Sequence, residues 1–150
     1  MNCRDVWRNA CCGKQNIPAI ILASFMIVVY TSLGIIGLVV KGPACGIGST
    51  VAINYWIEIA GICYCVAAGI FVLVLFGIFF DWLWSYTILP WATQVGLFIL
   101  TVIGTVTLST STDCVLTSKD VWSVAMAQVI MYFISILLFA VGFVVACNAA

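Results

Sequence analysis

Residues 51–80, VAINYWIEIAGICYCVAAGIFVLVLFGIFF, decide the fold, because this stretch carries a single side chain of the charged types Asp, Glu, Lys and Arg, Glu58. About twenty apolar residues in a helix cover a hydrocarbon core about 30 Å thick, and a helix satisfies its own backbone hydrogen bonds there. The stretch is therefore predicted to be a membrane-spanning helix that is long enough to tilt or to project past the headgroups.

Three other apolar segments meet the same test, so that the predicted spans cover residues 17–40, 51–80, 91–108 and 121–147. Asn16 is a predicted N-cap for the first span, with Pro18 in its first turn. The third span is the shortest, and a re-entrant loop is the alternative there. We expect an all-α, integral membrane four-helix bundle that forms one domain over residues 1–150.

The composition excludes several classes of function. Hydrophobic residues make up 65% of the chain and charged residues 7%, and the mean hydropathy of +1.28 is incompatible with a surface that faces water. Five basic residues balance five acidic ones, so no basic face is available for nucleic acid. Histidine is absent, which removes the commonest general base and metal ligand. We therefore expect no enzymatic activity, cofactor, metal or nucleic-acid partner, and membrane lipids as the surroundings.

The positions of the basic residues predict the orientation. Arg4, Arg8 and Lys14 precede the first span, which places the N-terminus in the cytosol by the positive-inside rule. Four crossings return the C-terminus to the same side. The predicted location is the plasma membrane or a membrane of the secretory pathway. Aromatic side chains at both predicted interfaces agree with four spans: Trp7, Trp82, Trp84 and Trp91 at one, and Tyr55, Trp56 and Trp122 at the other.

Two groups of cysteines lie outside the predicted spans. Cys45 and Cys114 are the cysteines of the two outer loops, where an oxidising compartment favours a disulfide between them. Two free thiols are the alternative. Cys3, Cys11 and Cys12 lie beside basic residues just before the first span, which is a typical setting for S-palmitoylation. Unmodified thiols are the alternative for these three.

Glu58 is the one acid within a predicted span, about two turns from its outer end. Such acids are costly, so Glu58 is expected to face the bundle interior, a water-filled cavity or a partner, as an ion or proton site or as part of a charged ring. The alternative is a shallow carboxylate near the interface, paired with Lys41 or Lys119 or hydrogen-bonded to hydroxyl groups. Gln94 and Gln128 are expected to form hydrogen bonds between helices.

Small residues form a stripe that permits close helix packing. In the second span Gly61, Cys65 and Gly69 recur every four residues, with Gly77 further along the same face. Matching small positions in the first and third spans are Gly34, Gly37, Gly96 and Gly104. These stripes are expected to make contacts within one bundle, or contacts between subunits.

The chain resembles two groups of small four-span proteins. Four spans, short loops, a brief N-terminus and one cysteine in each outer loop resemble the metazoan MARVEL-type tetraspan proteins. Cys11, Cys12, the Ile17-Pro18 start of the first span and the segment from Cys114 into the fourth span resemble the transmembrane protein 272-like family. The MARVEL-type resemblance covers the whole chain as architecture. It implies homo-oligomerisation and roles in membrane organisation, at vesicles or junctions, and it assigns no functional residue.

Three functions therefore compete. The first is a non-enzymatic membrane protein that oligomerises, or acts as a structural or accessory subunit organising a membrane assembly. The second is a subunit of an oligomeric ion channel or pore, with Glu58 near the pathway and a polar face formed by Thr101, Thr105 and Ser109. The third, a proton-translocating proteolipid-like subunit, requires an acid near mid-membrane, and Glu58 is predicted to be shallower than that.

Overall fold

The fold is all-helical, and four of its helices are each long and apolar enough to cross a bilayer. The computed structural model describes residues 17–40, 52–79, 83–111 and 114–148. Its helices are α2 (Ile17–Val39), α3 (Ile53–Phe79), α4 (Leu83–Thr110), α5 (Cys114–Thr117) and α6 (Lys119–Asn148). The prediction of an all-α fold with four potential spans is confirmed. Which side of a membrane the ends occupy stays a prediction.

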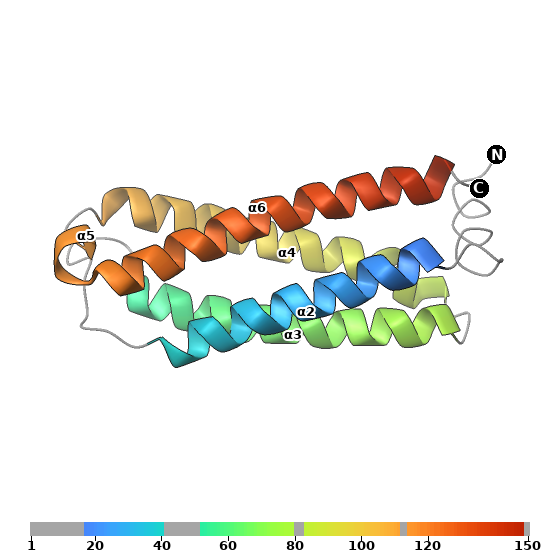
Figure 1. The fold of residues 1–150 in the computed structure, drawn as a ribbon, viewed down its shortest axis with the longest axis horizontal. Helices are drawn as coiled ribbons and strands as arrows, with labels where there is room; N and C mark the ends of the chain where they lie inside the picture. Colours follow the sequence, from blue (N-terminus) through green and yellow to red (C-terminus); the bar gives the residue numbers. More distant parts are fainter. Residues whose placement is uncertain (1–16, 41–51, 80–82, 112–113, 149–150) are drawn as a thin grey trace.

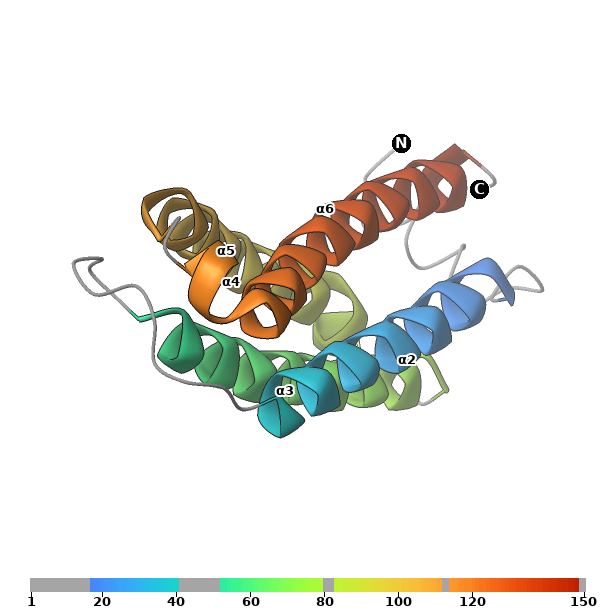
Figure 2. The ribbon, with the colours of Figure 1, turned by 60° about the vertical axis from the view of Figure 1, so that its left-hand side comes forward.

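The four long helices form a bundle in which α3 and α6 also contact each other across one diagonal. Helix α2 packs against α3 and α6, and α4 packs against the same two helices from the opposite corner. Figure 1 shows the helices running along a common axis, with the start of α2 and the end of α6 at the same end. In Figure 2, α2 and α3 form one side of the bundle and α4 and α6 the other. The α2–α3 interface is the most extensive of these contacts.

Helix α4 is longer than the sequence predicts. It begins at Leu83 rather than at Trp91 and includes Pro90 within the helix. Proline removes one backbone hydrogen bond and clashes with the carbonyl four residues earlier, which is why a start after Pro90 is the natural expectation. Membrane helices nevertheless tolerate proline, because neighbouring groups can compensate for the lost bond. The result is one continuous helix of 28 residues, and not the two short arms of a re-entrant loop.

Aromatic side chains fill the core, while the outer surface is apolar. Only 28% to 39% of the residues in an 18-residue apolar stretch of each candidate span are buried, and large hydrophobic side chains point outward from all four helices. Inside, the rings of Tyr30 and Tyr64 stack with their centroids 5.8 Å apart, and Phe71 lies 5.7 Å from Tyr30. Phe139 of α6 contacts Phe71 edge-on at 6.5 Å and thereby joins α6 to this aromatic cluster. A bundle that is filled inside and apolar outside suits a lipid environment.

Candidate functional site

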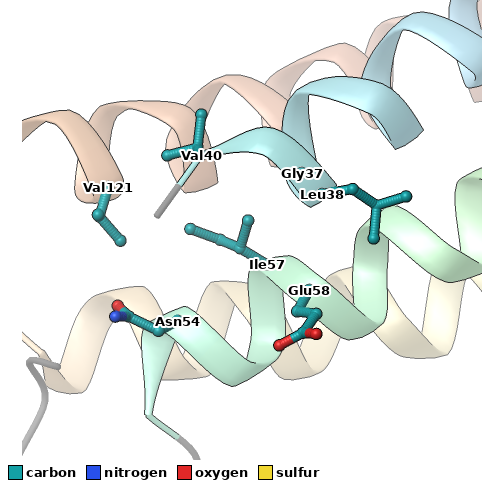
Figure 3. A pocket seen from close by; sticks show the side chains of 7 residues that line it. All are labelled: Gly37, Leu38, Val40, Asn54, Ile57, Glu58 and Val121. Carbon is teal, nitrogen blue, oxygen red and sulfur yellow. The ribbon is translucent and has the colours of Figure 1, made fainter. Parts of the chain in front are cut away.

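A pocket of about 240 Å³ lies at the end of the bundle where α2 ends and α3 and α6 begin. Its lining residues, drawn in Figure 3, are Gly37, Leu38, Val40, Asn54, Ile57, Glu58 and Val121. Asn54 and Glu58 are one helical turn apart on α3 and form the polar part of the wall. The other described residues of the wall, from α2 and α6 and Ile57 of α3, are apolar. The pocket therefore combines one acidic group with an apolar wall.

The acid predicted to lie within a span, Glu58, is exposed at this pocket and does not point into the core. It lies five residues after Ile53, where both α3 and its candidate span begin, which is about 8 Å along the helix axis. The exposed position speaks against the bundle interior as the surroundings of Glu58, and the shallow carboxylate stays a prediction. Lys119, one of its predicted partners, is also exposed, and the other, Lys41, lies outside the described residues. Pairing with either lysine stays a prediction.

The predicted small positions of α2 and α3 meet at the closest approach of these two helices. A Cβ atom built on Gly61 would lie 3.0 Å from the carbonyl oxygen of Gly34 and 3.1 Å from the carbonyl carbon of Gly37. A Cβ on Gly34 would in turn collide with the sulfur of Cys65. Because the backbones themselves are in contact, any side chain at Gly61 has to push the two helices apart.

Gly37 has a second role, because it makes room for a side chain from α6. A Cβ at Gly37 would lie 2.7 Å from Nε2 of Gln128. That amide nitrogen donates a hydrogen bond of 3.1 Å to the carbonyl oxygen of Leu33, one turn earlier on α2. The absence of a side chain at Gly37 thus lets Gln128 connect α6 to the backbone of α2.

Gly104 of α4 lies directly under the ring of Trp56 of α3. A Cβ at this position would overlap the six-membered ring of the indole. The Trp56 side chain is 2% exposed, and its indole N–H donates a hydrogen bond of 3.1 Å to the carbonyl of Leu100. Trp56, which the sequence places in an interfacial aromatic belt, is therefore a core residue between α3 and α4. Its polar atom is satisfied inside the bundle and not by headgroups or water.

Gly69 and Gly96 lie apart from these contacts, because a Cβ on either would have no non-local heavy atom within 4 Å. Both are exposed, whereas Gly77, the last member of the stripe, is buried. Gly96 lines an apolar groove of about 270 Å³ between α3 and α4. The other lining residues are Cys63, Val66, Ala67, Ile70, Thr93 and Leu97. Part of the small-residue pattern thus faces outward, where the bundle itself does not use it.

A polar cluster lies at the centre of the bundle, and sequence reasoning missed its tyrosines. Tyr30, Tyr64 and Tyr132 are each fully buried. The Gln94 amide nitrogen donates to the Tyr30 hydroxyl at 2.8 Å, and the Tyr132 hydroxyl donates to the backbone carbonyl of Gln94 at 2.9 Å. The Tyr30 hydroxyl also lies 3.5 Å from that of Ser135. A tyrosine in the middle of a predicted span could have indicated this cluster, since its hydroxyl needs a hydrogen-bond partner inside the bundle.

These bonds confirm the expectation that Gln94 and Gln128 connect helices. Gln94 joins α4 to α2 across the diagonal of the bundle, and Gln128 joins α6 to α2. The Thr and Ser side chains expected on a polar face of α4 behave differently. Thr101, Thr105 and Ser109 donate their hydroxyl protons to carbonyls three or four residues earlier in the same helix. Their donors are satisfied without water or ions.

Of the eight cysteines, the structure describes the side chains of three, Cys63, Cys65 and Cys114. Cys114, at the start of α5, is fully buried and disulfide-bonded. Cys45, its predicted partner, lies outside the described residues, so the pairing stays a prediction. The predicted palmitoylation positions Cys3, Cys11 and Cys12 also lie outside them. Cys63 and Cys65 of α3 are free thiols, and Cys63 lines the α3–α4 groove.

No protein family model, curated protein or solved structure matches the chain. The geometry of its own residues is therefore what bears on its function. Among the described residues, no group of three or more His, Cys, Asp or Glu side chains is placed to hold a metal ion. The features that remain are the polar core, the outward-facing groove and the pocket at Glu58.

Proposed function

We propose that the chain is a non-enzymatic, four-span membrane protein that associates with itself in the bilayer and organises a membrane assembly. The observation that carries this proposal is the outward-facing α3–α4 groove with Gly96 in its wall. Small residues on a lipid-facing helix allow a second helix to approach closely, and van der Waals packing then holds the two together. The resemblance to MARVEL-type proteins points to the same behaviour.

In this proposal the two sets of glycines have different tasks. Gly34, Gly37 and Gly61 are used within the bundle, where α2 and α3 touch. Gly96 and Gly69 have open space beside them and remain available to a helix of a second copy. The free thiol of Cys63 lies in the same groove, so crosslinking at Cys63 can detect a second copy that binds there.

Replacing Gly96 with leucine is expected to weaken self-association at least about tenfold without unfolding the protein. The new side chain fills the groove from inside, and it meets no intramolecular obstacle because no other atom lies near that position. Loss of close packing at a membrane interface accounts for an effect of about 1.4 kcal/mol. Fluorescence energy transfer between labelled copies in liposomes, measured over a range of protein-to-lipid ratios, checks it.

Phe98→Leu provides the matched control, because Phe98 is an exposed residue of the same helix outside the groove. It should associate like the wild type. A bifunctional maleimide should link two copies through Cys63 in the wild type and in Phe98→Leu, but not in Gly96→Leu. Energy transfer that is equal in all three proteins would contradict the assignment of the groove.

The orientation and location belong to the same proposal. Both ends of the chain are placed on the cytosolic side, with the pocket at Glu58 on the outer side of the plasma membrane or a secretory-pathway membrane. The disulfide between Cys45 and Cys114 then lies in an oxidising compartment. Palmitoylation at Cys3, Cys11 and Cys12 would strengthen anchoring of the cytosolic segment.

A pore between assembled subunits is the second candidate function, and the exposed position of Glu58 favours it over a pore within one bundle. Aromatic side chains fill the interior of the single bundle, so an ion path requires several copies arranged around an axis. If this candidate holds, planar-bilayer recordings of the reconstituted wild type show cation currents that Glu58→Gln lowers severalfold. The absence of currents in such recordings at high protein density would contradict the pore as a function.

A further inference from the structure

We propose that the polar core binds one internal water molecule, which the hydroxyl groups of Tyr64 and Thr101 and the side-chain amide of Gln128 hold between them. The site joins α3, α4 and α6, and the Gln128 amide extends it to the Leu33 carbonyl of α2. This assignment goes beyond self-association and does not depend on it. It rests on two buried polar atoms that lack partners and on the contacts that bring them to one level of the bundle.

The two atoms without a hydrogen-bond partner in this part of the described chain are the Tyr64 hydroxyl and Oε1 of Gln128. Tyr64 is fully buried and Gln128 is 1% exposed, so neither atom is solvated from outside the bundle. The orientation of the Gln128 amide follows from its contact, because a reversed amide would place two oxygens against each other at Leu33. Unpaired polar atoms are costly inside a membrane bundle, so both require a partner.

The contact between α2 and α3 places these two atoms at the same level. Nε2 of Gln128 and Cα of Gly61 both lie within 3.0 Å of one point, the place of a Cβ at Gly37. Tyr64 follows Gly61 by three residues on the same face of α3, and long side chains of a helix lean back toward the preceding turn. The Tyr64 hydroxyl is thereby directed toward the level of Gln128.

Thr101 of α4 supplies the third group. Its hydroxyl interacts with that of Tyr64, although the two lack the geometry of a direct hydrogen bond. Thr101 is fully buried, and its proton is donated to the Leu97 carbonyl, so its oxygen remains available as an acceptor. Two polar groups that face each other without a direct bond are typically bridged by water.

Water matches the needs of all three groups. It can accept the Tyr64 proton and donate its own two protons, one to Oε1 of Gln128 and one to the Thr101 oxygen. Buried waters in proteins typically make about three such bonds. A metal ion or an ammonium group would instead bring a charge into the bundle, and the buried residues described in the core include no acid to balance it.

Replacing Tyr64 with phenylalanine tests the water through the sign of the effect on stability. The change removes the hydroxyl and keeps the ring. Because water holds the hydroxyl, the equilibrium constant for unfolding in mixed micelles should rise about fivefold, as for the loss of one ordinary hydrogen bond. A hydroxyl without a partner would give the opposite sign, since its removal relieves the cost of burying it. An unchanged or lower equilibrium constant would therefore overturn the proposal.

Nuclear magnetic resonance of the full chain in nanodiscs, isotopically labelled at glutamine, detects the water itself. Rotating-frame Overhauser transfer, which differs in sign from proton exchange, should pass from water to the side-chain amide protons of Gln128 in the wild type. Combining Tyr64→Phe with Thr101→Val should abolish this transfer, because a single partner then remains for the water.

Thr107→Val is the matched control, since Thr107 is also buried in α4 and donates to a carbonyl four residues earlier. It should keep the full transfer. Absence of transfer in the wild type, or equal transfer in the double variant, would overturn the proposal. A signal that changes with the sodium concentration would also overturn it, because a cation would then be the occupant.

Discussion

Replacing Gly61 with leucine is expected to lower the free energy of unfolding by about 3 kcal/mol, at the upper end for overpacked positions. The atoms that a Cβ would meet are backbone atoms of α2: the Gly34 oxygen at 3.0 Å, and the Gly37 carbon and the Leu38 nitrogen at 3.1 Å each. Backbone atoms cannot rotate away as a side chain can, so α2 and α3 must separate along their most extensive contact. Alanine is a weaker test, because its gain in helix propensity of about 1 kcal/mol offsets part of the crowding.

Reversible unfolding in mixed micelles measures this effect, with Gly69→Leu as the control on the same helix. A Cβ at Gly69 would have no non-local atom within 4 Å, so its replacement should not lower the free energy of unfolding and should raise it by up to about 1 kcal/mol through helix propensity. Equal stability of the Gly61→Leu and Gly69→Leu variants would contradict the close approach of α2 and α3 at Gly61.

Replacing Gly104 with alanine should cost about 3 kcal/mol or more, although the change adds a single methyl group. That methyl occupies the place of the Trp56 ring, so the indole must leave a site in which it is 2% exposed. Its departure breaks the hydrogen bond to the Leu100 carbonyl and leaves a poorly filled space between α3 and α4. Losing a large buried aromatic side chain from its site typically costs about 3 to 5 kcal/mol.

A double-mutant cycle with Trp56→Leu isolates this contact. Leucine does not extend to the position of the indole ring, so Gly104→Ala should cost little in that background, and the coupling free energy should exceed about 2 kcal/mol. Gly96→Ala, on the same helix but in open space, should be neutral or slightly stabilising. Additive costs for the Gly104 and Trp56 variants would show that the two residues do not contact each other.

The sequence predicts the number and approximate position of the long helices because hydropathy and length are properties of one segment at a time. It does not predict which faces meet. Gly61 and Gly69 belong to one stripe with a period of four, yet only Gly61 lies at the α2–α3 contact. Helix crossing confines close approach to a short stretch, and the crossing point depends on all four helices together.

Trp56 shows the same limit for aromatic residues. A tryptophan three residues into a span has the pattern of an interfacial anchor. It is a core residue because α4 lies opposite. Gly104, 48 positions later in the chain, leaves space for the indole ring, and the carbonyl of Leu100 accepts the hydrogen bond of the indole N–H. The buried tyrosines Tyr30 and Tyr132 were closer to predictable, since both lie well within their spans, where a hydroxyl requires an internal partner.

The polar core also has a consequence for the order in which the protein assembles during synthesis. The α2–α3 contact joins consecutive helices, so a hairpin can form as soon as both have entered the membrane. The bonds of the core join residues much further apart: 64 positions for Gln94 and Tyr30, and 95 for Gln128 and Leu33. Until α4 arrives, the hairpin holds the Tyr30 hydroxyl without its glutamine, whereas the Leu33 carbonyl already accepts the backbone hydrogen bond of its own helix before Gln128 arrives with α6. The core therefore closes only after α6 has joined the bundle, and the early hairpin is an intermediate that membrane-protein quality control can recognise by its unsatisfied tyrosine hydroxyl.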